Sequence, residues 1–139
     1  MTILFTLIFS ISAFSACQTA TTGKATNTQG NSMRQDEIKQ ITVAQAKDAV
    51  TAKDMQFIDV RTAEEYAGGH AAKAAHFPLD ALEKDLSRLD KDKPVYVICQ
   101  TGRRSQKGAE ILNKAGFKNI YNIQGGTGAW VDAGFPTEK

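Results

Sequence analysis

The sequence predicts an α/β protein with a mostly parallel central sheet and helices on both of its faces, and three observations carry this prediction. Short apolar runs rich in β-branched residues alternate with segments of helical periodicity. The run at residues 94–99 is too continuously hydrophobic for a strand with one wet face, so it fits a sheet that is covered on both sides. Residues 37–139 carry the alternation, and this length is sufficient for one hydrophobic core.

The first half of this region is predicted to contain two capped helices with a strand between them. Thr42 is followed by Gln45, and Thr62 by Glu65, so each pair has the spacing of a capping box at a helix start. The apolar run at residues 55–60 is predicted to form the strand. The next stretch, "AAHFPL", is extended, and its proline confines it to a strand end or a sheet edge.

The second half is predicted to contain further helices and strands in alternation. One helical face of residues 79–90 carries Leu79, Leu82, Leu86 and Leu89. The buried strand at 94–99 follows, and then a helix that begins near Ser105 and stops at Gly116, a residue suited to a helix C-cap. Residues 119–123 form the last predicted strand, and a glycine turn with a short helix closes the chain.

Charge and histidine spacing argue against several classes of ligand. The formal net charge is only +2 and no run of lysine and arginine forms a stripe, so nucleic-acid binding is not expected. His70 and His76 have no further Cys, Asp or Glu at ligand spacing, so neither a metal site nor a cofactor is expected.

The N-terminal segment predicts export. Residues 2–16 are apolar or small, but as a helix they would span only about 22 Å, less than the roughly 30 Å of a bilayer core. A secretory signal peptide over residues 1–17 fits better. Because Ser15 and Ala16 precede Cys17, the segment resembles a bacterial lipoprotein signal, which implies a periplasmic protein with a lipid attached to Cys17. An ordinary cleaved signal peptide and a retained N-terminal anchor are the alternatives.

Residues 18–36 are predicted to be a flexible linker before the domain at 37–139. The segment is rich in Thr, Gln, Asn and Gly and has no hydrophobic period. Its root-mean-square reach is about 24 Å, so an anchored domain would stand clear of the membrane surface. Contact with a membrane is expected only through that anchor, and the domain is expected to be a monomer.

Cys99 is the strongest candidate for chemistry. The sequence holds two cysteines, and if Cys17 is lipidated or removed, Cys99 is the only thiol left. The loop "CQTGRR" follows a predicted strand, and ligands of open α/β sheets bind beyond the carboxyl ends of strands. The free N–H groups of a tight loop and a helix start favour an anion there. Such surroundings and nearby arginine lower a thiol pKa from about 8.5 to about 6.5 or less. The alternatives are a cysteine that only fills the core and a solvated surface pair at Arg103 and Arg104.

Taken together, these motifs resemble those of the rhodanese family, single-domain sulfurtransferases. The resemblance extends from about residue 41 to residue 130 and rests on "IDVRTAEEYAGGH", "AAHFPLDAL", "CQTGRRS", "GF" and "GGTGAW". The chain departs from the family pattern near the site. Lys73 stands where the family commonly has glycine, and Gln100 stands where some thiosulfate-using members have a basic residue.

The resemblance implies a rhodanese-like three-layer fold and a catalytic Cys99. The Cys99 thiolate would take a sulfane sulfur from thiosulfate or a persulfide donor, hold it as a persulfide, and pass it to cyanide or a thiol. The residues implied in binding the small anionic donor are those of the loop: Gln100, Thr101, Gly102, Arg103, Arg104 and Ser105. Structural roles near the site are expected for Asp59, Arg61 and His70.

Two other functions remain open from the sequence. A persulfide carrier or sensor would need the same cysteine without rapid turnover. A cysteine phosphatase or an arsenate reductase on the same fold has five residues between cysteine and arginine, whereas Cys99 and Arg104 are separated by four. The shorter loop should suit a sulfur atom better than a tetrahedral phosphate.

Overall fold

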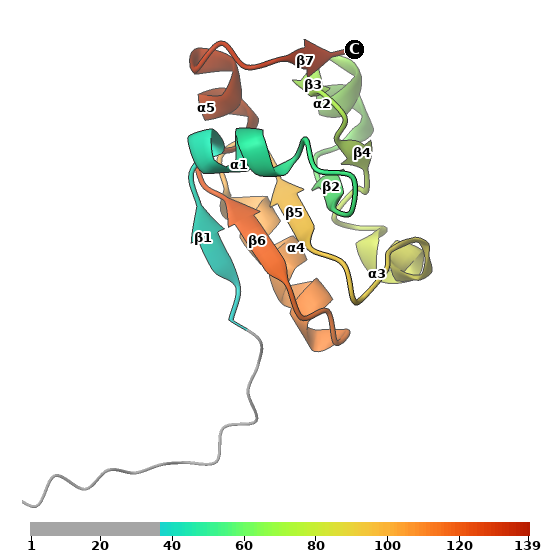
Figure 1. Cartoon of the computed structure of the whole chain (residues 1–139). Coiled ribbons are helices and arrows are strands. Elements are labelled where there is room, and N and C mark those ends of the chain that lie inside the picture. The colour runs from blue at the N-terminus through green and yellow to red at the C-terminus, as the bar shows by residue number, and fades with distance from the viewer. Residues whose placement is uncertain (1–36) are drawn as a thin grey trace, which may run out of the picture. The chain divides into compact units, whose positions relative to one another are not determined.

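The computed structural model describes residues 37–139, shown in colour in Figure 1. The predicted signal peptide at 1–17, lipidation of Cys17 and the linker at 18–36 lie outside the described residues. Those assignments therefore stay predictions.

Within residues 37–139 the main sheet contains five strands in the order β1–β6–β5–β2–β4, and every neighbouring pair is parallel. The strands are β1 (Lys39–Ile41), β2 (Gln56–Asp59), β4 (Ala75–His76), β5 (Val95–Ile98) and β6 (Ile120–Ile123). A small antiparallel sheet pairs β3 (His70–Ala71) with β7 (Thr137–Glu138). The predicted, mostly parallel α/β architecture is confirmed.

The side chains of β5 alternate between two cores, one on each face of the sheet. Val95, Val97 and Cys99 belong to the core beneath α3 (Leu82–Asp85) and α4 (Arg103–Lys114). Tyr96 and Ile98 belong to the other core, which α1 (Val43–Ala49) and α5 (Gly126–Asp132) cover. Figure 1 shows α1 and α4 on opposite sides of the sheet. The alternation therefore directs the Cys99 side chain to the α4 side.

Both predicted capping boxes are present. The Thr42 side chain accepts from the Gln45 N–H, and the Gln45 side chain accepts from the Thr42 N–H. Thr62 and Glu65 make the same two contacts at the start of α2 (Ala63–Ala67). Each box satisfies backbone donors that would otherwise have no partner at the helix start.

Two predicted helices differ in their bounds. The leucine-rich helix is shorter than expected, because α3 ends at Asp85 and tightens into the 3₁₀ turn η1 (Leu86–Arg88), as often happens at helix ends. Its leucines still pack against the α4-side core. The helix expected near Ser105 begins two residues earlier, at Arg103, so both arginines lie in its first turn.

Helix α5 is held on the sheet by an aromatic cluster. The Trp130 ring lies 5.8 Å from the Phe57 ring and meets the Phe135 ring edge-on at 5.3 Å, between centroids. The Trp130 indole N–H donates to the Pro136 carbonyl at 2.9 Å. These contacts hold α5 on the core that it shares with α1.

Among residues 37–139, no helix combines the length and the apolar character needed to cross a bilayer.

Candidate functional site

The candidate site is the loop between β5 and α4, which begins at Cys99. Gly102 is the N-cap of α4 and has a φ of +97°, a conformation that glycine adopts without a Cβ clash. This turn brings the Gly102 N–H back to the Cys99 sulfur, to which it donates at 3.1 Å. Cys99 is a free, buried cysteine. The sulfur thus lies against backbone N–H groups as well as against the α4-side core.

The surroundings lower the pKa of the Cys99 thiol. Burial raises this pKa, but the Ser105 hydroxyl and the backbone N–H groups of Ser105, Thr101 and Gly102 together lower it by more. The Ser105 Oγ atom is buried and has no hydrogen bond of conventional geometry within residues 37–139, so its proton is available to the sulfur. An anion at this position is stabilised by these hydrogen bonds, and it also interacts favourably with the charge of Arg104.

Helix α5 sets the direction in which the loop amides point. The Thr127 N–H donates to the Cys99 carbonyl at 2.7 Å, and the Gly128 N–H donates to the Gln100 carbonyl at 3.1 Å. Because C=O and N–H point in opposite directions across a trans peptide, tying the Gln100 carbonyl to α5 turns the Thr101 N–H away from α5. A Cβ atom at Gly126 would overlap the Cys99 carbonyl oxygen, so this approach requires glycine.

A buried ion pair supports the other side of the loop. Asp59 and Arg61 are almost fully buried, and the Arg61 Nε atom lies 3.1 and 2.9 Å from the two Asp59 carboxylate oxygens. Arg61 also donates to the Gly69 carbonyl at 2.7 Å and to the Gln100 side-chain oxygen at 3.2 Å. The Gln100 side chain therefore accepts from the buried Arg61 guanidinium. A basic residue in place of Gln100 would repel this guanidinium.

The two loop arginines have different environments. Arg104 donates to both carboxylate oxygens of Glu65. The Arg103 side chain is exposed and makes no ion pair or hydrogen bond with residues 37–139. The sequence grouped the two as anion ligands, but in the structure Arg104 is already neutralised. The partnership with Glu65 was not foreseen, since no local pattern signals a partner 39 residues away.

His70 lies in an aromatic stack. Its ring stacks on Tyr66 at 3.7 Å between centroids, and its Nδ1 lies 3.0 Å from the Tyr66 carbonyl. His76 stacks on the same tyrosine at 4.5 Å. The stack connects to the loop through Gly69, whose carbonyl binds Arg61. No group of three or more His, Cys, Asp or Glu side chains within the described part of the chain could hold a metal ion.

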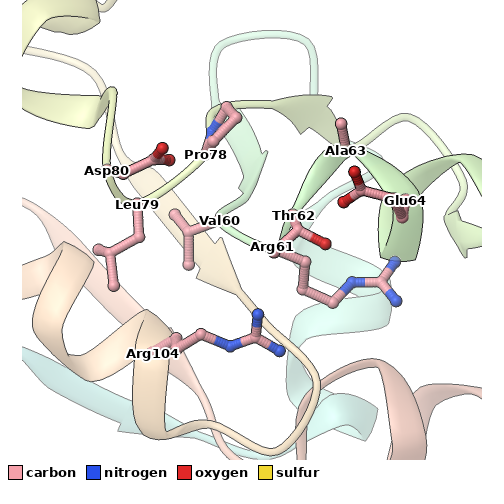
Figure 2. A pocket seen from close by; sticks show the side chains of 9 residues that line it. All are labelled: Val60, Arg61, Thr62, Ala63, Glu64, Pro78, Leu79, Asp80 and Arg104. Carbon is pink, nitrogen blue, oxygen red and sulfur yellow. The ribbon is translucent and has the colours of Figure 1, made fainter.

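A hollow of about 590 Å³ lies beside the loop, between α2 and the segment that follows β4 (Figure 2). We call it the Asp80 hollow. Figure 2 shows Asp80 and Glu64 on opposite walls, with Arg104 below them. Its lining residues are Val60, Arg61, Thr62, Ala63, Glu64, Pro78, Leu79, Asp80 and Arg104. Both arginines that line it already have carboxylate partners.

Comparison with known proteins identifies the family. Residues 42–133 match the rhodanese-like domain, and the chain belongs to this family. Its fold is the rhodanese-like α/β fold. The structure resembles that of a rhodanese-like domain protein from Staphylococcus aureus, with a TM-score of 0.62 and 35% sequence identity. The similarity covers 67% of this chain and 91% of the other chain.

Three relatives come from Bacillus subtilis (strain 168). The chain is 38% identical over 95 residues to "Putative sulfurtransferase YtwF", covering 68% of this chain and 91% of that protein. It is 36% identical over 78 residues to "Putative sulfur carrier protein YrkF", covering 56% of this chain and 42% of that protein. It is 43% identical over 75 residues to "Uncharacterized protein YqhL", covering 54% of this chain and 60% of that protein. The chain thus spans less than two thirds of the last two.

Proposed function

We propose that the protein is a sulfurtransferase that moves a sulfane sulfur, from thiosulfate or a persulfide donor, to cyanide or a thiol through a persulfide on Cys99. The observation that carries the proposal is the Gly102 N–H donating to the Cys99 sulfur at 3.1 Å, inside a loop that lowers the thiol pKa. The relatives named for sulfur transfer and sulfur carriage support the same chemistry.

The proposed first step forms a sulfur–sulfur bond. The Cys99 thiolate attacks the outer sulfur of thiosulfate, the bond between the two thiosulfate sulfurs breaks, and sulfite leaves with the electron pair. The new outer sulfur carries the negative charge that the thiolate had. Loop N–H groups and the Ser105 hydroxyl stabilise an anion here, so the persulfide is held without a general base.

The second step returns the enzyme to its starting state. A thiolate or cyanide attacks the outer sulfur, and the bond to the Cys99 sulfur breaks with its electron pair remaining on Cys99. The low pKa of this thiol makes it a good leaving group. Two half-reactions at one cysteine predict ping-pong kinetics.

Mass spectrometry tests the persulfide directly. The Cys17→Ala protein, in which Cys99 is the only cysteine, should gain the mass of one sulfur after incubation with thiosulfate. Its Cys99→Ser derivative should not. Unmodified protein after incubation with both thiosulfate and a small-molecule persulfide would overturn the proposal.

A persulfide carrier is the second candidate, and the similarity to "Putative sulfur carrier protein YrkF" favours it. A carrier would gain the sulfur but form no thiocyanate at a measurable catalytic rate when cyanide is added. The phosphatase alternative is separated in the same assays, because it would hydrolyse an aryl phosphate and gain no sulfur.

We also propose export to the periplasm with a lipid on Cys17, on the strength of the N-terminal pattern alone. Labelled palmitate should enter the wild-type protein in cells and not the Cys17→Ala variant. Equal labelling of the two would contradict lipidation.

A further inference from the structure

Among residues 37–139, three hollows that lie at or near the cysteine loop differ in charge. The Asp80 hollow is the first. The second, the Asp132 hollow, of about 440 Å³, is lined by Arg61, Glu64, Glu65, Gly68, Gly69, Gln100, Thr127, Gly128, Val131 and Asp132. The third, the Lys107 hollow, of about 630 Å³, is lined by Gln40, Thr101, Gly102, Arg103, Gln106, Lys107, Glu110, Asn122, Gln124 and Gly125.

In two of the hollows, carboxylates outnumber the cations that have no carboxylate partner. The arginines that line them are Arg61 and Arg104, which are paired with Asp59 and Glu65. Glu64 lines both hollows, and Asp80 and Asp132 add one carboxylate each. Neither aspartate forms an ion pair with residues 37–139. With the arginines neutralised, the remaining charge on both surfaces is negative.

The Lys107 hollow has the opposite character. Arg103 and Lys107 are four residues apart on α4 and therefore share one helix face. Neither forms an ion pair with residues 37–139, and Glu110 is the one carboxylate among the residues that line the hollow. The same hollow is lined by Gly102, whose N–H contacts the sulfur. The Lys107 hollow thus combines two cations that form no ion pair within residues 37–139 with a residue of the cysteine loop.

The other wall of the Lys107 hollow is made of side-chain amides. Gln40 donates to the Gln106 side-chain oxygen at 2.7 Å, and the Asn122 amide nitrogen donates to the Gln40 oxygen at 2.8 Å. The Asn122 side-chain oxygen is buried and has no donor within residues 37–139. Such a wall suits a ligand that carries amide groups of its own. The volume lies in the range of small-molecule sites and exceeds what an inorganic anion requires.

From this asymmetry we propose that the Lys107 hollow binds the acceptor, a small amide-bearing thiol with a carboxylate, and that Arg103 and Lys107 bind its carboxylate. This inference rests on the proposed function, because the acceptor takes the outer sulfur from the Cys99 persulfide. The acceptor thiolate forms the new sulfur–sulfur bond, the bond within the Cys99 persulfide breaks, and the Cys99 thiolate leaves with its electron pair.

A matched pair of acceptors isolates the carboxylate. N-acetylcysteine and N-acetylcysteamine carry the same thiol and acetamide, but only the first has a carboxylate. The full-length Cys17→Ala protein is loaded with thiosulfate, freed of donor, and mixed with each thiol, and decay of the persulfide is followed by mass spectrometry. In the Arg103→Gln/Lys107→Gln variant, the ratio of the rate constants for N-acetylcysteine and N-acetylcysteamine should fall about fivefold to tenfold.

A charge-matched control removes two exposed lysines elsewhere. The Lys84→Gln/Lys114→Gln variant has the same net charge and should keep the wild-type ratio to within about twofold. A second measurement needs no variant. Raising the salt concentration should slow the decay of the persulfide with N-acetylcysteine and leave its decay with N-acetylcysteamine nearly unchanged, because salt screens exposed charges.

The outcomes separate the two proposals. If the protein loads with sulfur but the ratio is unchanged in Arg103→Gln/Lys107→Gln, or salt affects both thiols equally, the acceptor site is wrong and the proposed function stands. If the protein never gains sulfur at the loading step, the proposed function is wrong and the acceptor site is wrong with it.

Discussion

Arg104 and Glu65 form a two-point ion pair that links α4, which follows the cysteine loop, to α2, which follows the Asp59–Arg61 pair. The two guanidinium nitrogens lie 2.5 and 2.7 Å from the two carboxylate oxygens. Arg104 is in the first turn of α4, where a positive charge opposes the helix dipole, and Glu65 offsets this effect. The Arg104 hydrogen bond lowers the pKa of Glu65 to about 2 although partial burial raises it.

Replacing Glu65 with glutamine should destabilise the protein by about 1 kcal/mol at neutral pH, because the pair is partly exposed to solvent. Glutamine keeps the capping contact to Thr62, so the loss reports the charge. A lowered folded-state pKa gives stability that is present above the unfolded value of about 4.3 and is lost as the pH falls towards 2. The difference between wild type and Glu65→Gln in urea unfolding should therefore shrink below about pH 4.3. Glu83→Gln, on an exposed face of α3, is the control and should show no comparable difference.

The Cys99 thiolate should form at a lower pH than an ordinary thiol, because hydrogen bonds to the sulfur lower its pKa by more than burial raises it. Ultraviolet absorbance of the thiolate in the Cys17→Ala background measures this without requiring a reagent to reach the buried sulfur. Ser105→Ala should raise the midpoint of thiolate formation, since it removes a hydroxyl that lowers the pKa. Ser87→Ala, on the exposed turn η1, serves as the control. A midpoint that Ser105→Ala leaves in place would show that the hydroxyl does not act on the sulfur.

Lys73→Gly should stabilise the protein. Lys73 has a φ of +70°, and it is the only residue other than glycine with a positive φ among residues 37–139. An L-residue in this region costs about 1–2 kcal/mol, and glycine gives back roughly 0.5–1 kcal/mol of that in backbone entropy. The melting temperature should rise by a few degrees. Lys53→Gly, in an exposed turn where φ is not positive, should lower the melting temperature. Equal changes in melting temperature in the two variants would refute backbone strain at Lys73.

Gly126→Ala should damage both folding and sulfur loading. The added Cβ would overlap the Cys99 carbonyl oxygen, so the start of α5 has to move away from the loop whose amides it orients. Gly134→Ala is a matched control, because its φ of +69° is close to the +59° of Gly126 but a Cβ there meets no atom within 4 Å. It should carry only the conformational cost, about 1–2 kcal/mol. Similar losses in the two variants would argue against the steric explanation.

Local sequence signals predicted most of this fold, and long-range pairing accounts for most of what they missed. The capping boxes at Thr42 and Thr62 and the strand before Cys99 were visible, since each depends on neighbours in the chain. Strand β1 was not, because it is only three residues long and Lys39 and Gln40 are exposed; its pairing with β6 determines its conformation. The early start of α4 was also missed, since glycine is a weaker N-cap signal than Ser, Thr, Asn or Asp.

At the site, the sequence located the cysteine and its loop but not the charges that matter around it. Which arginine is neutralised depends on Glu65, a residue from another helix. The difference between the hollows likewise depends on α2, the segment after β4 and α5, which only the folded chain brings to one place. Residue type alone could not separate Arg103 from Arg104.

The chain has one tryptophan, Trp130, and it lies on the helix that holds the Cys99 and Gln100 carbonyls. The fluorescence of this indole therefore comes from a single buried tryptophan on the helix that orients the cysteine loop. Any event that lifts α5 from the sheet wets the ring and shifts its emission to longer wavelength. The protein thus carries a native optical probe of the element that shapes its cysteine loop, and no label has to be added.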